Sequence, residues 1–316
     1  MNKSSRIYVA GHRGLVGSAV IRKLKASGYD HIITRTSKVL DLRRQEAVEA
    51  FFREEQPEYV FLAAARVGGI LANATYQADF IYDNIMIAAN VIKAAADSNV
   101  KKLVNLGSSC IYPRRAPQPL KEEYLLTGPL EPTNEPYAIA KIAAIKLCRY
   151  FNAQYGTNFI SVMPTNLYGP NDNFDLETSH VLPALIRRFH EAKEQKLPSV
   201  TLWGDGSPER EFLYVDDLAE ALIFLMEHYD VQQTGEFVNL GTGKDISIKE
   251  LAMLIRKIVG FRGAINWDIS KPNGTPKKLL SLGLINKLGW KYKISLQEGL
   301  QFTYSWFHET MLKKNI

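Results

Sequence analysis

Strand-like and helix-like segments alternate along the first half of the chain, and this alternation restricts the fold more than any other feature. Apolar runs rich in β-branched residues are each followed by an amphipathic helical pattern. The predicted strands are residues 6–11, 31–36, 59–65, 102–108 and 159–169. The predicted helices are residues 18–28, 45–57, 79–99 and 137–156. Because the strands lack polar alternation, they predict an α/β fold, a Rossmann-type doubly wound parallel sheet covered on both faces.

The pattern changes after Pro170, where loop-rich segments replace the regular alternation. We therefore expect a Rossmann domain over residues 1–168, with residues 212–242 returning to it. A smaller α/β C-terminal domain that binds the substrate is expected from residues 169–211 and 243–316.

Composition excludes several classes of protein. The chain has 316 residues, 46% hydrophobic and 23% charged, with a net charge of +6 spread over scattered basic residues. No basic helix, RNA-binding signature or zinc-finger spacing indicates a nucleic-acid partner. The two cysteines lack metal-ligand spacing, so no metal is expected. Arg66 interrupts the longest apolar stretch, and no signal peptide precedes the first strand, so we expect a cytoplasmic protein that does not bind a membrane.

Three glycines follow the first predicted strand. Gly11, Gly14 and Gly17 form GxxGxxG directly before a helix. Such a turn lets a pyrophosphate approach the backbone and the N–H groups of the helix N-terminus. A purely structural turn is the alternative, but the strand–loop–helix context favours a dinucleotide site.

The end of the second predicted strand indicates which dinucleotide is bound. Arg35 and Lys38 occur there, the first acidic residue is Asp41, and Arg13 lies inside the glycine loop. Cations without a carboxylate suit a 2′-phosphate, so NADP(H) is expected rather than NAD(H). The alternative is that Arg35 and Lys38 are solvated surface charges.

Tyr137 and Lys141 are four residues apart on a predicted helix, which places them on one face. A nearby ammonium favours the phenolate, so we expect a lowered pKa for Tyr137 and proton exchange with a substrate. Ser108 ends the fourth strand and can hydrogen-bond the same carbonyl oxygen. Together with the glycine loop, these residues predict reduction of a ketone, although YxxxK alone is more often an ordinary helix surface.

Cys110 and His180 suggest a second kind of chemistry. In an extended segment, the side chains of Ser108 and Cys110 point the same way. A thiolate can remove a proton from a carbon next to a ketone, and a histidine can return one to the opposite face. Either residue alone would more often be structural.

Longer motifs carry a more specific resemblance. GHRGLVGSA, AAARVGGILAN, GSSCIYP, EPTNEPYAIAKIA, MPTNLYGPNDNF and WGDGSPEREFLYVDD occur in this order over nearly the whole chain. The sequence resembles the extended, sugar-nucleotide branch of the short-chain dehydrogenase/reductase superfamily. This resemblance implies a two-step, NADPH-dependent reaction on GDP-4-keto-6-deoxy-D-mannose: epimerisation at C3 and C5 by Cys110 and His180, then hydride reduction at C4 with Tyr137 as proton donor.

The resemblance also implies further binding residues and a homodimer. The expected cofactor contacts are Gly11, His12, Arg13, Gly14, Leu15, Val16, Gly17, Arg35, Ser37, Lys38, Asp41, Leu42, Leu106, Gly107, Ser109, Lys141, Pro164, Thr165, Asn166, Leu167 and His180. The expected contacts with the GDP-sugar are Arg188, Trp203, Arg210 and Asn273.

Four positions depart from the family pattern, and they leave alternatives open. Ser37 stands where an arginine is usual, and Asn273, Lys277 and Ser281 replace two aspartates and an arginine. A related NDP-4-keto-6-deoxy sugar is therefore an alternative substrate. A non-catalytic NADPH sensor is an alternative of another class, against which the intact Tyr137–Lys141 pair argues.

Overall fold

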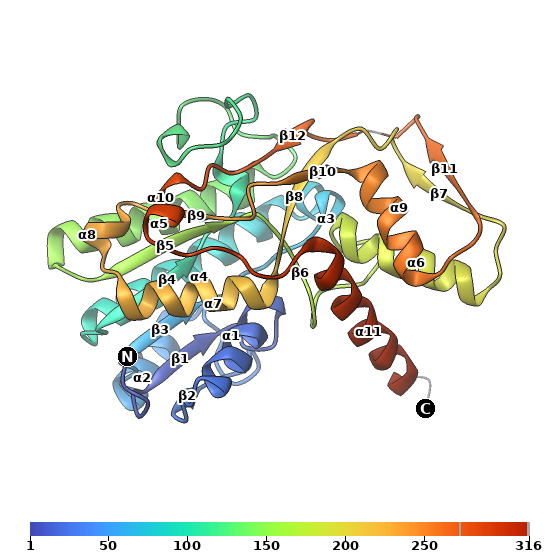
Figure 1. Ribbon diagram of the computed structural model, residues 1–316. Coiled ribbons are helices and arrows are strands. Elements are labelled where there is room, and N and C mark those ends of the chain that lie inside the picture. Colours follow the sequence, from blue (N-terminus) through green and yellow to red (C-terminus); the bar gives the residue numbers. More distant parts are fainter. Residues whose placement is uncertain (272, 315–316) are drawn as a thin grey trace.

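A six-stranded parallel sheet forms the centre of the first half of the molecule. The computed structural model describes residues 1–271 and 273–314. The strand order is β2-β1-β3-β4-β5-β9 (Figure 1). These strands are β1 Ile7–Ala10, β2 Ile32–Ile33, β3 Tyr59–Leu62, β4 Lys102–Leu106, β5 Phe159–Pro164 and β9 Val238–Leu240. The predicted Rossmann-type α/β fold is confirmed.

Helices cover both faces of this sheet, as the apolar strands predicted. One face packs against α1 Leu15–Ala26 and α7 Val215–His228. The other face packs against α2 Gln45–Glu55, α4 Gln77–Asp97 and α5 Glu135–Tyr155. Alternate residues of β1 enter the two cores, because Ile7 and Val9 face α1 while Tyr8 and Ala10 face α2. The sheet therefore holds the loops at its carboxyl ends between two packed layers.

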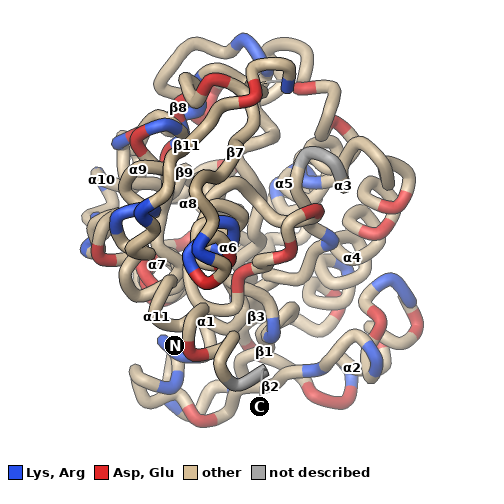
Figure 2. The backbone as a smooth tube through the Cα atoms, turned by 90° about the vertical axis from the view of Figure 1, so that its right-hand side faces the viewer, with Lys and Arg blue, Asp and Glu red and all other residues tan. Residues whose placement is uncertain are grey.

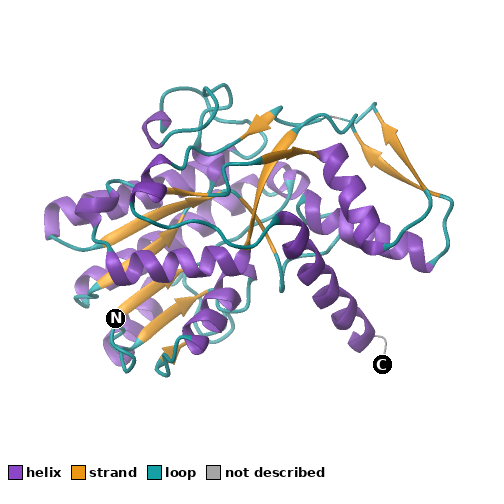
Figure 3. Ribbon diagram, in the orientation of Figure 1, coloured by secondary structure: helices purple, strands orange, loops and turns teal. Residues whose placement is uncertain are grey.

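A second group of elements lies to one side of the sheet, at the right of Figure 1. It contains a four-stranded sheet and a strand pair, with helices packed beside them (Figure 3). The strands are β6 Asn166–Tyr168, β8 Glu209–Tyr214, β10 Asp245–Ser247, β12 Lys277–Lys278, β7 Ser199–Trp203 and β11 Ala264–Asp268. The helices are α6 Val181–Glu194, α9 Ile248–Val259 and α11 Leu296–Lys314.

The chain passes between the two groups at Thr165. The predicted strand over residues 159–169 divides there, so that β5 stays in the parallel sheet and β6 pairs with β8. Residues 209–214 consequently belong to the smaller sheet, whereas α7 and β9 lie with the large one. Short helices complete the connections: α3 Ile70–Thr75, α8 Val231–Thr234 and α10 Gly283–Lys287, with the 3₁₀ turns η1 Ser109–Ile111 and η2 Glu122–Tyr124.

Basic and acidic residues are interspersed along the backbone, as Figure 2 shows. Within residues 1–271 and 273–314, no helix is both long enough and apolar enough to cross a bilayer.

Candidate active site

The glycine loop joins β1 to α1 and leaves the helix N-terminus open. Gly11 has φ of +82°, and a Cβ there would lie 2.7 Å from the Ala64 nitrogen. A Cβ on Gly17 would lie 2.2 Å from the Gly11 oxygen, so neither position tolerates a side chain. Gly14 begins α1 without a side-chain cap, and the next N–H groups belong to Leu15, Val16 and Gly17. Unsatisfied N–H groups at a helix N-terminus favour a pyrophosphate.

The cations expected to meet a 2′-phosphate differ in their surroundings. Arg13 and Lys38 are exposed, as is Ser37. Arg35 instead forms an ion pair with Glu55 of α2 and lies 5.5 Å from the centre of the Phe51 ring. The geometry thus favours Arg13 and Lys38 over Arg35 for a phosphate.

Two other predicted cofactor residues are also engaged within the chain. Burial, followed by the charge of Arg13, lowers the pKa of His12, which hydrogen-bonds the backbone of Arg35. Asp41 accepts hydrogen bonds from Arg43, which lower its pKa to about 2. Leu42 beside it is buried.

Ser108 and Cys110 meet where β4 ends. Ser108 begins the 3₁₀ turn η1, and its Oγ accepts hydrogen bonds from the Cys110 backbone nitrogen at 3.4 Å and from Cys110 Sγ at 3.0 Å. The expectation of an extended segment was wrong, because the capping hydroxyl turns the chain into η1. The predicted proximity of the two side chains nevertheless holds, and the thiol is buried.

Tyr137 and Lys141 lie on α5, close to this turn. The Tyr137 side chain is hydrogen-bonded with Ser108. Lys141 Nζ donates to the Leu106 carbonyl oxygen at 2.7 Å and lies 5.7 Å from the centre of the Tyr137 ring. Burial raises the pKa of Tyr137, with Cys110 adding to the effect, and burial lowers the pKa of Lys141 to about 8. The expected lowering of the Tyr137 pKa is not found, because burial of the phenol and the nearby Cys110 raise it more than the Ser108 hydrogen bond lowers it.

Cys110 also faces Lys278 of β12, which sequence reasoning did not identify. Burial raises the pKa of Cys110, while the charge of Lys278, the Ser108 hydrogen bond and the charge of Lys141 act in the opposite direction. Lys277 instead forms ion pairs with Glu209 and Asp245. Because neighbouring strand residues point to opposite faces, one of two consecutive lysines is expected to face the site. The Lys277–Lys278 pair was therefore the signal in the sequence that could have identified Lys278.

His180 occupies the N-cap position of α6 without a side-chain cap, and the residue is exposed. The segments around its ring nevertheless keep part of the surrounding water away, and this desolvation lowers its pKa. The loop after β3 contacts this segment, because the Gly69 N–H donates to the Thr178 oxygen at 2.8 Å. A Cβ on Gly69 would lie 2.7 Å from the Ser179 oxygen, so glycine permits the close approach.

The predicted substrate residues come from the smaller group of elements. Trp203 is 59% exposed, which excludes a core role, and Lys271 Nζ lies 5.7 Å from its ring centre. Arg210 pairs in register with Lys278, so it lies beside the Cys110 side of the site. Asn273 Oδ1 accepts from the Asp205 backbone nitrogen at 2.9 Å, near Trp203 in the chain. Arg188 lines a separate surface groove with neighbouring residues of α6 and β7.

The remaining predicted cofactor residues lie at the ends of β4 and β5. Leu106 and Ser109 are buried, and Gly107 packs against Met163. Pro164 ends β5, and Leu167 lies in β6. The side chains of Thr165 and Asn166 both donate to the Glu211 backbone oxygen, at 3.1 and 2.8 Å.

Comparisons with known proteins agree with this geometry. A family model described as the NAD dependent epimerase/dehydratase family matches residues 7–241. GDP-L-fucose synthase 1 of Arabidopsis thaliana is 57% identical over 306 residues, covering 97% of this chain and 94% of that protein.

Two solved structures are similar throughout. A GDP-6-OMe-4-keto-L-xylo-heptose reductase from C. jejuni has a TM-score of 0.94 at 41% identity, covering 98% of this chain and 99% of that one. A GDP-L-fucose synthetase from Naegleria fowleri bound to NADP has a TM-score of 0.90 at 31% identity, covering 99% and 96%. As the resemblance predicted, the chain belongs to the NAD dependent epimerase/dehydratase family.

Proposed function

We propose that the chain converts GDP-4-keto-6-deoxy-D-mannose to GDP-L-fucose in two steps, with NADPH as reductant. The observation that carries the proposal is the Cys110 thiol, which hydrogen-bonds Ser108 at 3.0 Å beside Tyr137 and Lys141. A ketone reductase needs a proton donor but no thiol. A thiol beside the substrate's ketone adds a group able to act on the carbons next to that ketone.

The proposed cofactor is NADP(H), and residues of the first domain would hold it. The open N-terminus of α1 suits the pyrophosphate, and the exposed cations Arg13 and Lys38 suit a 2′-phosphate. The NADP-bound relative supports this choice. We assign residues 1–168, with 212–242, to cofactor binding.

Epimerisation is the first proposed step. The C4 ketone makes the protons at C3 and C5 acidic. Cys110 as thiolate removes the proton from one face, and His180 returns a proton to the other face. Burial raises the pKa of Cys110 and lowers that of His180, so both groups are neutral at rest. A proton must therefore first pass from the Cys110 thiol to the His180 imidazole. Lys278 and Lys141 stabilise the thiolate through their charges.

Reduction of the ketone is the second proposed step. NADPH, when bound, supplies the hydride that C4 receives. Tyr137 donates its proton to O4, and its raised pKa keeps the phenol protonated until the alkoxide forms. Ser108 orients the ketone oxygen. Lys141, which donates a hydrogen bond to the Leu106 carbonyl oxygen, places its positive charge beside the phenol.

The GDP-sugar would lie against residues 169–211 and 243–316. Arg210 suits the diphosphate, and the exposed Trp203 ring suits the base or sugar, whereas Arg188 lines the separate groove of α6 and β7. Asn273 uses its carbonyl oxygen on Asp205, so its amide nitrogen would be the group that donates to a ligand there. The proposed substrate is the GDP-sugar named above, and a related NDP-4-keto-6-deoxy sugar is the alternative.

The proposal includes a cytoplasmic homodimer. Three tyrosine side chains on helices α4 and α5 are largely exposed: Tyr82 of α4 at 60%, and Tyr150 and Tyr155 of α5 at 58% and 61%. Helices α4 and α5 pack against each other, so these rings suit contact with a second copy. Light scattering of the purified chain tests this state, and a monomeric mass would contradict it.

The test of the proposed function is turnover of GDP-4-keto-6-deoxy-D-mannose with NADPH, followed by NMR of the product. We expect a product inverted at C3 and C5 and reduced at C4. A reduced product with unchanged C3 and C5 would contradict the epimerase step. Turnover only with a related keto sugar nucleotide would support the alternative substrate.

A further inference from the structure

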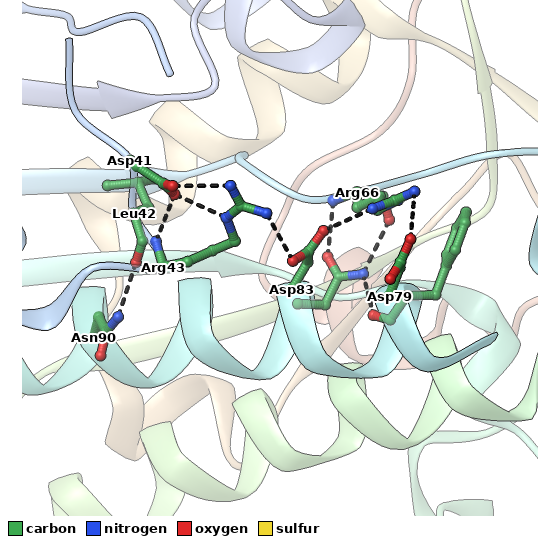
Figure 4. Close-up of polar contacts among 9 residues, drawn as sticks. Asp41, Leu42, Arg43, Arg66, Asp79, Asp83 and Asn90 are labelled. Atoms are coloured by element: carbon green, nitrogen blue, oxygen red, sulfur yellow. Dashed lines mark hydrogen bonds and ion pairs between the residues drawn. The ribbon is translucent and has the colours of Figure 1, made fainter. Parts of the chain in front are cut away.

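Five charged side chains form a continuous chain of ion pairs along helix α4 (Figure 4). Arg43 binds Asp41 at 2.8 Å and Asp83 at 3.1 Å. The other oxygen of Asp83 accepts from Arg66 at 2.9 Å, and Arg66 also binds Asp79 at 3.0 Å. Asp83 is thus the single link between the two arginines in this chain of contacts.

Asp83 is the buried member of the series. Its side chain is 10% exposed, against 45% for Arg43 and 37% for Arg66. Burial alone would raise the pKa of Asp83, but the hydrogen bonds from Arg66 and Arg43 together lower it. A buried carboxylate with two charged donors has a fixed position, because losing either donor leaves one of its oxygens without a charged partner.

One end of the series reaches residues 37–42, which are expected to contact the cofactor and to line its adenosine. Asp41 accepts two side-chain hydrogen bonds from Arg43, and Leu42 follows it. Helix α4 holds the same segment a second time, because Asn90 Nδ2 donates to the Leu42 oxygen at 2.9 Å. Asn90 lies seven residues, about two helical turns, after Asp83, so both contacts leave the same face of α4.

The other end of the series lies near Tyr137, the residue proposed to donate a proton to the substrate. Asn84 fixes the backbone of Arg66 by accepting from its nitrogen at 2.9 Å and donating to its oxygen at 3.0 Å. The Arg66 guanidinium lies 5.6 Å from the centre of the Phe80 ring. Phe80 in turn packs edge-on against Tyr137, with ring centres 6.3 Å apart.

The loop after Arg66 continues to the segment that carries His180. Asn73 donates to the oxygens of Gly68 and Gly69, which closes the loop on itself. The Gly69 N–H then donates to the Thr178 oxygen, two residues before His180. Arg66 therefore precedes a hydrogen-bonded connection to the His180 segment and also borders Tyr137 through Phe80.

We propose that Asp83 is a positioning residue, which holds the adenosine-side segment and residues 66–69 in register on α4. It thereby sets Tyr137 and His180 relative to a bound dinucleotide. This role rests on the proposed function, since it assigns a position to the residues that carry out its two steps. Asp83 itself touches no reacting atom.

The test compares Asp83→Asn with Asp97→Asn. Asp97 lies on the same helix in an exposed ion pair with Lys93, so its loss controls for charge removal on α4. Three quantities are measured: the Kd of NADPH by fluorescence titration, and the rates of deuterium exchange and of reduction at saturating ligands, normalised to cofactor-binding sites. For Asp83→Asn we expect a raised Kd and both rates lowered about tenfold, because misplacing reacting groups is costly. Asp97→Asn should match the unaltered chain.

Equal Kd and equal normalised rates in both variants would overturn the proposal, even if Asp83→Asn melts at a lower temperature. If Asp83→Asn does not fold, Arg43→Gln and Arg66→Gln replace it. We expect Arg43→Gln mainly to raise the Kd of NADPH and Arg66→Gln mainly to lower the saturated rates. The absence of both effects would equally overturn the positioning role.

Failure of the proposed function has a different signature. In that case the unaltered chain would bind NADPH and leave the sugar nucleotide unchanged. The comparison of NADPH affinity still decides the role of Asp83, because this measurement needs no sugar. A raised Kd for Asp83→Asn would support the link to the adenosine side, and an unchanged Kd would refute it.

Discussion

The two sides of the candidate site are built differently. The reducing side, formed by Ser108, Cys110, Tyr137 and Lys141, lies on β4, η1 and α5, and its polar groups bond to one another or to the backbone. The sugar-nucleotide side presents exposed groups such as Trp203 on short strands and loops. Chemistry is thus placed on buried, fixed elements, and recognition on elements that border solvent.

The largest expected effect is on the buried side. Tyr137→Phe removes the proton donor but keeps the ring that packs on Phe80. We expect reduction at C4 to fall about 10²–10⁴-fold, the usual contribution of a positioned acid. Deuterium exchange at C3 and C5 should persist, because Cys110 and His180 remain. Stopped-flow oxidation of NADPH measures the first quantity, and full reduction by this variant would refute the assignment of Tyr137.

A smaller effect is expected where the two sides meet. Lys278→Met removes the cation that stabilises the Cys110 thiolate, so the pKa of Cys110 should rise further. A rise of one pKa unit, equivalent to about 1.4 kcal/mol, would slow deuterium exchange at saturating substrate about tenfold.

Lys277→Met is the matched control for this variant. Lys277 is adjacent in the chain but forms ion pairs with Glu209 and Asp245. Equal slowing of exchange by the two substitutions would show that the charge of Lys278 has no special relation to the thiol.

Trp203→Ala tests the exposed side alone. Since the ring is 59% exposed, we expect stability within about 0.5 kcal/mol of the unaltered chain. Loss of stacking on a base, worth about 1 kcal/mol or more, should raise KM roughly fivefold with little change in kcat. Steady-state kinetics measures this split, and a fall in kcat at constant KM would place Trp203 with the chemistry.

The smallest expected effect is a response to pH. Inversion at C3 and C5 requires the Cys110 thiolate together with the His180 imidazolium, whereas proton exchange needs the thiolate alone, so the pH dependence is measured on inversion by NMR. Burial holds the pKa of His180 below 6.5 and that of Cys110 above 9.0. Below the lower value the thiolate is lost, and above the higher value the imidazolium is lost, so the rate of inversion should be flat across neutral pH. A rate that climbs steadily from pH 6.5 to 9 would contradict this assignment.

Sequence patterns predicted the buried side better than the exposed side. Strand and helix periodicity located the parallel sheet, and the spacing of Tyr137 and Lys141 placed both on α5, because these signals are local. Three features depend on contacts between distant segments: the ion pair of Arg35 with Glu55, the pairing of β6 with β8, and the approach of Lys278 to Cys110. The raised pKa of Tyr137 likewise follows from burial, which spacing alone does not reveal.

Deuterium exchange by a thiol variant tests the central claim most directly. Cys110→Ala should bind NADPH and fail to introduce solvent deuterium at C3 and C5 of GDP-4-keto-6-deoxy-D-mannose, as followed by NMR. Cys148→Ala is the control, because Cys148 is the other buried thiol and packs from α5 into the core on that face of the sheet. We predict normal exchange in Cys148→Ala and none in Cys110→Ala. Normal exchange in Cys110→Ala would contradict the account and leave a simple ketone reductase.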